Sequence, residues 1–167
     1  MKKANFKHIV LLLMISLMTV FTACSSDNTN NNATSAPVEL DITQIAQEIV
    51  DGNVFKDTLA PIDSSYSEML MKITTDEYVS AVIYMGSGAT AERLAVFEAA
   101  DSTAAEALKE KCTTHITEQT AAYADYMPEE VDKLNNAFVK TNGKYVILCV
   151  AQDYEVAKKM IGTYFPN

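Results

Sequence analysis

A run of apolar residues near the C-terminal end restricts most strongly what this chain can fold into. Residues 146–150 read Val-Ile-Leu-Cys-Val without a polar side chain, shortly after Asn142-Gly143. Successive side chains of a strand point to opposite faces, so this strand has to be covered on both faces. Asn-Gly supplies the positive φ angles of a type I′ hairpin turn. The pattern predicts a central strand over residues 144–150, in a hairpin with a strand over 137–140.

A second hairpin is predicted in the middle of the chain. Residues 77–85 are rich in β-branched and aromatic side chains and are followed by the loop signature Gly86-Ser87-Gly88. Residues 91–99 supply the partner strand. Helix is the alternative for this run, because Ala91-Glu92-Arg93-Leu94-Ala95 contains good helix formers. The short loop before the run, and a helix cap at Asp101 after it, favour the strand.

Apolar residues at helical spacing predict three main helices around these hairpins. The first follows a cap at Asp41, ends before Gly52 and turns Ile42, Ile45 and Ile49 toward a core. The second and longest runs from Ser102 to about Asp125. The third follows a cap at Asp153. A short helix around Met69 and Leu70 and an acidic helical turn after Pro128 are also expected.

This order of elements predicts the fold class. Two hairpins separated by a helix indicate an α+β domain, with an antiparallel sheet of about four strands packed against an N-terminal helix, a long central helix and a C-terminal helix. The chain has 167 residues, of which 49% are hydrophobic. Such a chain can bury one ordinary core. We therefore expect a single domain over residues 38–167.

The N-terminal segment has the pattern of an export signal. Lys2, Lys3 and Lys7 precede the run Ile9–Phe21, which only Ser16 and Thr19 interrupt. A run this short does not span a bilayer core of about 30 Å, so we expect residues 1–23 to be removed as a signal peptide.

The end of that segment contains a cysteine in a characteristic position. Phe21-Thr22-Ala23-Cys24 resembles the lipobox of bacterial lipoproteins, in which the cysteine is acylated before the signal peptidase cuts in front of it. The usual lipobox has Leu where Phe21 stands. The resemblance implies cleavage between Ala23 and Cys24, and a lipid such as palmitate on Cys24. A plain secretory signal with an incidental cysteine is the alternative.

The chain after Cys24 is acidic and begins with a polar segment. It carries ten Lys and Arg residues against 22 Asp and Glu residues, which argues against nucleic acid as a partner. Residues 24–37 are rich in Ser and Asn and offer nothing to bury, so we expect a flexible linker that reaches about 20 Å. The predicted location is the extracytoplasmic face of the cell membrane, held by lipid, since anionic headgroups repel an acidic domain.

The whole arrangement resembles a known family. The lipobox, the Ser/Asn linker, Ala91-Glu92-Arg93-Leu94-Ala95-Val96-Phe97 after a Gly loop, and Tyr145-Val146-Ile147-Leu148 after Asn-Gly are similar to the small clostridial lipoproteins grouped as domain of unknown function 4358. The resemblance would cover about residues 38–165. It implies a surface lipoprotein of a Gram-positive, often anaerobic bacterium, and it transfers no catalytic residue.

Few residues point to chemistry. Cys112 and His115, one turn apart on the long predicted helix, could supply two metal ligands or a thiolate–imidazole pair, but two ligands are too few for the usual metal sites. The favoured interpretation places Cys112 on the apolar face of the helix, as a small hydrophobic residue, and His115 at the edge of that face. Cys112 and Cys149 are either two core cysteines, the interpretation we favour, or a disulfide, which an oxidising compartment permits. We predict no catalytic residue, no metal site and no cofactor.

Tyr123 and Tyr126 form the densest aromatic stretch, near the end of the long helix. They either close the core or contact a partner, since amphipathic rings are common at interfaces. The leading functional hypothesis is a lipid-anchored binding or accessory module with an envelope protein as partner and no enzymatic activity. A small-ligand-binding or sensor lipoprotein is the second hypothesis, and a wall-glycan hydrolase with paired carboxylates is the third. The sequence leaves the partner and the oligomeric state open.

Overall fold

The computed structural model describes residues 39–166. The expected signal peptide over residues 1–23, its cleavage position at Ala23 and Cys24, and the linker up to residue 37 lie outside the described residues.

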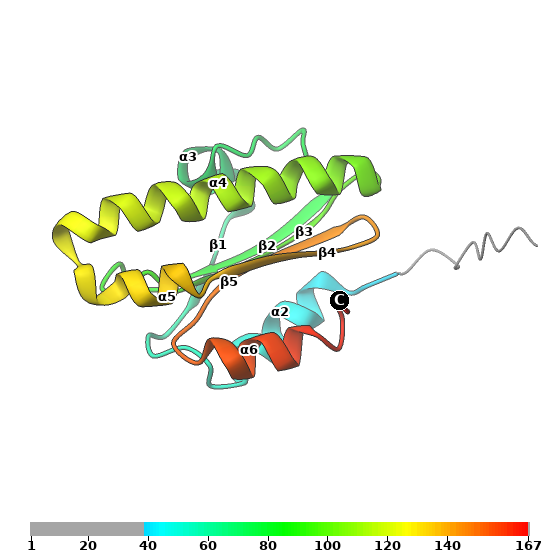
Figure 1. Cartoon of the computed structure of the whole chain (residues 1–167). Helices are drawn as coiled ribbons and strands as arrows, with labels where there is room; N and C mark the ends of the chain where they lie inside the picture. The colour runs from blue at the N-terminus through cyan, green and yellow to red at the C-terminus, as the bar shows by residue number, and fades with distance from the viewer. Residues whose placement is uncertain (1–38, 167) are drawn as a thin grey trace, which may run out of the picture. The chain divides into compact units, whose positions relative to one another are not determined.

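A five-stranded sheet forms the middle of the domain (Figure 1). The strands follow the order β1-β2-β3-β5-β4, and every neighbouring pair is antiparallel. Their bounds are β1 (Ala60–Ile62), β2 (Ser80–Met85), β3 (Arg93–Glu98), β4 (Phe138–Asn142) and β5 (Tyr145–Val150). The predicted α+β class and both predicted hairpins are confirmed. The additional strand, β1, is a three-residue edge strand that contains Pro61.

Helices cover both faces of the sheet, as Figure 1 shows. One face packs against α2 (Ile42–Asp51) and α6 (Tyr154–Ile161). The other packs against α3 (Ser67–Met71), α4 (Ser102–Tyr126) and α5 (Val131–Asn135). Two short 3₁₀ turns, η1 (Ser64–Tyr66) and η2 (Pro128–Glu130), precede α3 and α5. The three main helices and the acidic turn after Pro128 lie where the sequence predicts them.

The strand predicted to be covered on both faces is buried at every residue of β5. Tyr145, Ile147 and Cys149 point into the core beneath α2 and α6. The alternate residues Val146, Leu148 and Val150 point toward α4. The pleat of one strand therefore supplies both halves of the hydrophobic core. Residues 93–98 form the neighbouring strand β3, so the helical alternative for that run is wrong.

Aspartate side chains begin the three main helices as predicted. Asp41 accepts hydrogen bonds from the amides of Thr43 and Gln44 at 3.0 Å. Asp101 accepts from the Ala104 amide at 2.8 Å, and Asp153 accepts from the Val156 amide at 3.2 Å. These bonds satisfy amides that have no partner within the first helical turn.

The turn between β4 and β5 differs from the prediction. Asn142 pairs with Tyr145, so the two turn residues are Gly143 and Lys144, and only Gly143 has a positive φ, of 58°. One positive φ at the first turn position is typical of type II′ rather than type I′. The reason lies at Asn142, whose side chain donates to the Tyr164 carbonyl at 2.7 Å and stays in the strand.

Candidate functional site

Buried charges gather where β3 begins. Glu92 precedes the strand, Glu130 ends η2 and Lys133 lies on α5, and each is almost completely buried. The Lys133 ammonium lies 3.2 Å from Oε1 of Glu92 and 3.0 Å from the Glu130 carboxylate. One cation therefore bridges two carboxylates from distant parts of the chain. Buried charges are tolerated when they are paired in this way.

The same carboxylates also hold backbone segments in place. Glu92 accepts hydrogen bonds from the amides of Lys56 and Asp57 at 2.7–3.0 Å. Glu130 accepts from the amide of Ala91 at 2.9 Å. The ionic cluster thus ties the segment before β1, the segment before β3 and the start of α5 together, and its charged groups are occupied by one another and by the backbone.

Arg93 and His115 form a second buried pair beside this cluster. Nη1 of Arg93 lies 2.6 Å from Nε2 of His115, while Nε donates to the Ala91 carbonyl and Nη2 donates to Gln119 Oε1. Burial, and secondly the charge of Arg93, lower the pKa of His115 to about 4. Burial also lowers the pKa of Arg93. His115 is therefore neutral near pH 7, with Nε2 accepting from the guanidinium and its proton on Nδ1.

The two buried cysteines stay apart. Cys112 lies in the core half beneath α4 and Cys149 in the half beneath α2 and α6, so the sheet separates them. Both are free thiols, and the disulfide alternative is therefore wrong. Burial raises the pKa of Cys112 to about 12 and raises that of Cys149 as well. Neither thiol is poised to ionise, and the imidazole of His115 is engaged by Arg93, so the structure assembles no thiolate–imidazole pair.

The tyrosines at the end of α4 take different environments. The ring centroids of Tyr123 and Tyr126 lie 4.9 Å apart. Tyr123 is buried, and its hydroxyl donates to the Thr90 carbonyl at 3.2 Å. Burial is the main cause that raises the pKa of Tyr123. Tyr126 is 60% exposed. Of the two predicted partner-contact residues, only Tyr126 offers a large surface.

The loop over residues 86–90 is held by Asp57. Its Oδ2 accepts hydrogen bonds from the amide and hydroxyl of Ser87, at 2.8 and 2.9 Å. These bonds, the backbone one first, lower the pKa of Asp57. A Cβ on Gly86 would lie 2.5 Å from the same oxygen. A Cβ at position 86 would therefore force the Asp57 carboxylate to shift, and the bonds from Ser87 to Asp57 hold the loop as a hairpin connection.

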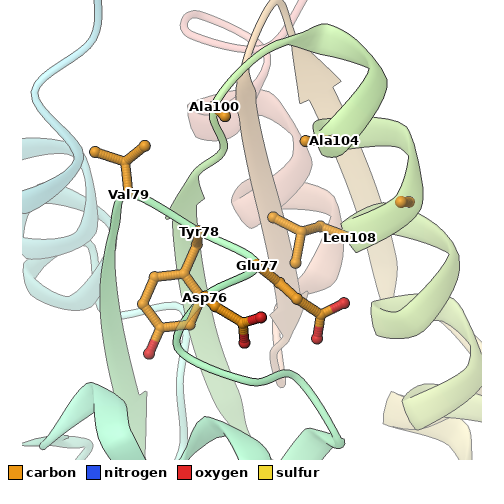
Figure 2. Close-up of a pocket in the computed structure, with 8 residues that line it drawn as sticks. Asp76, Glu77, Tyr78, Val79, Ala100, Ala104 and Leu108 are labelled. Atoms are coloured by element: carbon orange, nitrogen blue, oxygen red, sulfur yellow. The ribbon is translucent and has the colours of Figure 1, made fainter.

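A small cavity lies at the opposite end of α4, as Figure 2 shows. The segment Asp76–Val79 and the first turns of α4, including Ala104 and Leu108, line about 240 Å³. Glu77 turns its carboxylate to Lys111 at 2.5 Å and to Thr74 at 2.9 Å. The cavity is smaller than the roughly 300–1,000 Å³ of most small-molecule sites.

The described residues offer neither a metal centre nor a membrane-spanning helix. Within residues 39–166, no group of three or more His, Cys, Asp or Glu side chains is arranged to hold a metal ion. No helix in this part of the chain is long and apolar enough to cross a membrane.

Sequence reasoning missed the buried ionic cluster. Its one local signal is the placement of Glu92-Arg93 inside an otherwise apolar run. Charged side chains at the start of a buried strand need partners, but Lys133 lies on α5 and His115 on α4, where sequence spacing does not identify them.

Comparison with known proteins places the chain in a family. The sequence model of a domain of unknown function, DUF4358, matches residues 56–151. This range includes the buried charged cluster and all five strands, β1 to β5. No curated protein and no solved structure matches the chain. The match covers more than half of the sequence, and the chain belongs to the DUF4358 family.

Proposed function

We propose that this protein is a bacterial lipoprotein, anchored by lipid on Cys24 at the extracytoplasmic face of the cell membrane, where its folded domain binds another component of the envelope. The observation that carries the proposal is the leader, in which three lysines and the apolar run Ile9–Phe21 end in Phe21-Thr22-Ala23-Cys24. Two acyl chains anchor stably, since each buried methylene contributes about 0.8 kcal/mol.

The described domain supports a binding role through what its polar residues do. The buried charged groups around Glu92 and Arg93 bond to one another and to backbone segments, so they fix the shape of the domain. A rigid surface binds with a smaller loss of conformational entropy than a mobile one. Tyr126 presents an exposed ring that packs at a tilt of 42° against the buried Tyr123, a favourable arrangement for a contact residue.

Replacing Cys24 tests the anchor. Cys24→Ala should move the protein from the membrane fraction to the medium and abolish incorporation of labelled palmitate. Ser25→Ala is the matched control and should leave both unchanged. Retention of the Cys24→Ala protein in washed membranes would contradict lipid anchoring.

Cross-linking in intact cells tests the binding role. A photoreactive residue in place of Tyr126 should capture one dominant envelope protein, and an excess of the unlipidated mature chain should compete for it. The same group in place of Val156, which is exposed on α6, reports whether capture depends on position. Capture that the mature chain fails to reduce would contradict a specific partner.

A further inference from the structure

A hollow lies beside the Arg93–His115 pair, between the end of α3 and the middle of α4. It holds about 470 Å³, a volume within the range of small-molecule sites. Met71 and Lys72 line it from the α3 side, while Ala107 and His115 line it from α4. The hollow is therefore larger than the cavity at the start of α4, and it has a different lining.

The hollow contains one donor that the protein leaves unused. His115 is 4% exposed, and as a lining residue it shows that small surface to the hollow. Its Nε2 accepts from the Arg93 guanidinium at 2.6 Å, so the ring proton is on Nδ1. Within residues 39–166, no acceptor lies within hydrogen-bonding reach of this Nδ1–H, and Nδ1 is not sealed from solvent. A buried ring therefore aims one unpartnered N–H into the hollow.

Buried neighbours hold this donor in a fixed direction. Arg93 is 7% exposed, and its guanidinium also donates to the Ala91 carbonyl at 3.1 Å and to Gln119 Oε1 at 3.2 Å. These bonds fix the guanidinium against Nε2, and its charge on that side of the ring polarises the Nδ1–H on the other. A donor fixed in this way needs little reordering when an acceptor binds to it.

The charged side chains around the hollow are already paired. The Lys72 ammonium lies 2.6 Å from the Glu118 carboxylate, and the Lys111 ammonium lies 2.5 Å from the Glu77 carboxylate. Glu110 adds a further carboxylate to the lining. The described lining residues therefore offer no free cation to an anionic ligand, and Glu110 repels one.

The walls next to the donor are apolar. Met71 is 5% exposed and lies on one side, and the methyl group of Ala107 lies on the other. Methionine is flexible and polarizable, so it adapts to different ligand shapes. Apolar walls around one oriented polar group are typical of small-molecule sites.

We propose that this hollow binds a small neutral molecule with an apolar body and a carbonyl oxygen. The oxygen accepts a hydrogen bond from Nδ1 of His115, and the apolar body lies between Met71 and Ala107. His115 is about 16 Å along α4 from Tyr126, at 1.5 Å per residue, so the two surfaces are separate. The small-molecule site adds to the proposed binding of an envelope component and does not depend on it.

NMR titration of the mature chain, from Cys24 with Cys24→Ser, tests the site and the ligand class at pH 7. The neutral probes are benzamide and cyclohexanone, and benzoate is the anionic analogue. We expect a neutral probe to shift the Nδ1 signal of His115 and the amide signal of Thr114, which also lines the hollow. The shifts should saturate with a dissociation constant of roughly a few millimolar, as expected for so small a molecule. Benzoate should bind about tenfold more weakly or less than that.

Filling the hollow tests the location without changing Arg93 or His115. Ala107 is exposed, so Ala107→Phe adds a ring to the hollow and not to the core. This variant should lose the shifts at His115. Ala124→Phe is the matched control, because Ala124 is an exposed residue of the same helix outside the hollow. It should leave the dissociation constant within about twofold.

Three results would overturn the proposal. The first is no saturable shift at His115 with either neutral probe up to about 50 mM, roughly tenfold above the expected constant, which would leave solvent as the only partner of Nδ1–H. The second is a shift that persists in Ala107→Phe. The third is benzoate that binds as tightly as benzamide. None of them bears on the proposed envelope binding, which the cross-linking at Tyr126 tests separately.

Discussion

Replacing Lys133 by methionine gives the sharpest test of the buried ionic cluster. The ammonium lies within 3.2 Å of two carboxylates whose side chains are 0% and 6% exposed. Removing one partner of a buried ion pair costs about 3–5 kcal/mol of stability. The amides of Lys56, Asp57 and Ala91 still donate to the stranded carboxylates. We therefore expect Lys133→Met to lower the free energy of unfolding by an amount near the lower end of this range, about 3 kcal/mol. This corresponds to a fall in Tm of roughly 10 °C for a domain of this size.

The loss should depend on pH in a defined direction. Without the ammonium, the folded variant favours the neutral acid form of one buried carboxyl group, so it binds a proton that the unfolded chain releases near neutral pH. Stability relative to the natural protein should then recover as the pH falls from 7 to 5. Urea unfolding followed by circular dichroism at both pH values measures this difference.

An exposed ion pair is the control. Lys109 lies 3.0 Å from Glu106, with side chains 40% and 58% exposed. Lys109→Met should cost less than about 1 kcal/mol at either pH, as exposed pairs do. Equal losses for Lys133→Met and Lys109→Met, or a Lys133→Met loss that grows at lower pH, would refute the reasoning.

Three further outcomes are expected. The pKa of His115 is about 4 in the folded protein against an ordinary 6.5, so its contribution to stability, up to about 3 kcal/mol, is complete above pH 6.5 and is lost as the pH falls toward 4. The difference in unfolding free energy between the natural protein and His115→Gln should follow this course. A difference that stays constant with pH would argue against it. Cys112 and Cys149 should react with a thiol reagent only on unfolding in a Cys24→Ser chain, and fast labelling of either one in the folded state would contradict their burial. Gly86→Ala should cost about 1–2 kcal/mol through its contact with Asp57, and adding Asp57→Ala should cost less in that background than in the natural chain, while strictly additive losses would exclude the contact as the cause.

Local patterns predicted the regular elements because local interactions form them. Asp41, Asp101 and Asp153 begin helices through bonds to amides two or three residues away. The apolar run in β5 required two covered faces, and helices cover both. β1 was missed because three residues around Pro61 have no alternation to detect, and the strand exists by pairing with β2.

Long-range contacts account for what the sequence did not predict. The turn at Gly143 is displaced by one residue because Asn142 bonds to Tyr164, far along the chain. The environment of Glu92 depends on Lys133, which approaches only when α5 packs on the sheet. The difference in exposure between Tyr123 and Tyr126 depends on the loop that carries Thr90. Spacing along the sequence contains none of these distances.

The strand order sets the time at which this domain can fold during synthesis. β3 and β4 are both made before β5, yet they do not neighbour each other, because β5 lies between them. Until residue 150 has been made, the edge of β3 that faces away from β2 has no partner strand. Until α6 follows, only α2 covers the face of the sheet on which both helices pack. Non-local pairing of this kind is slow and needs the whole chain. The complete five-stranded sheet therefore forms only after residue 150 has been made, which delays folding relative to the synthesis of its first four strands.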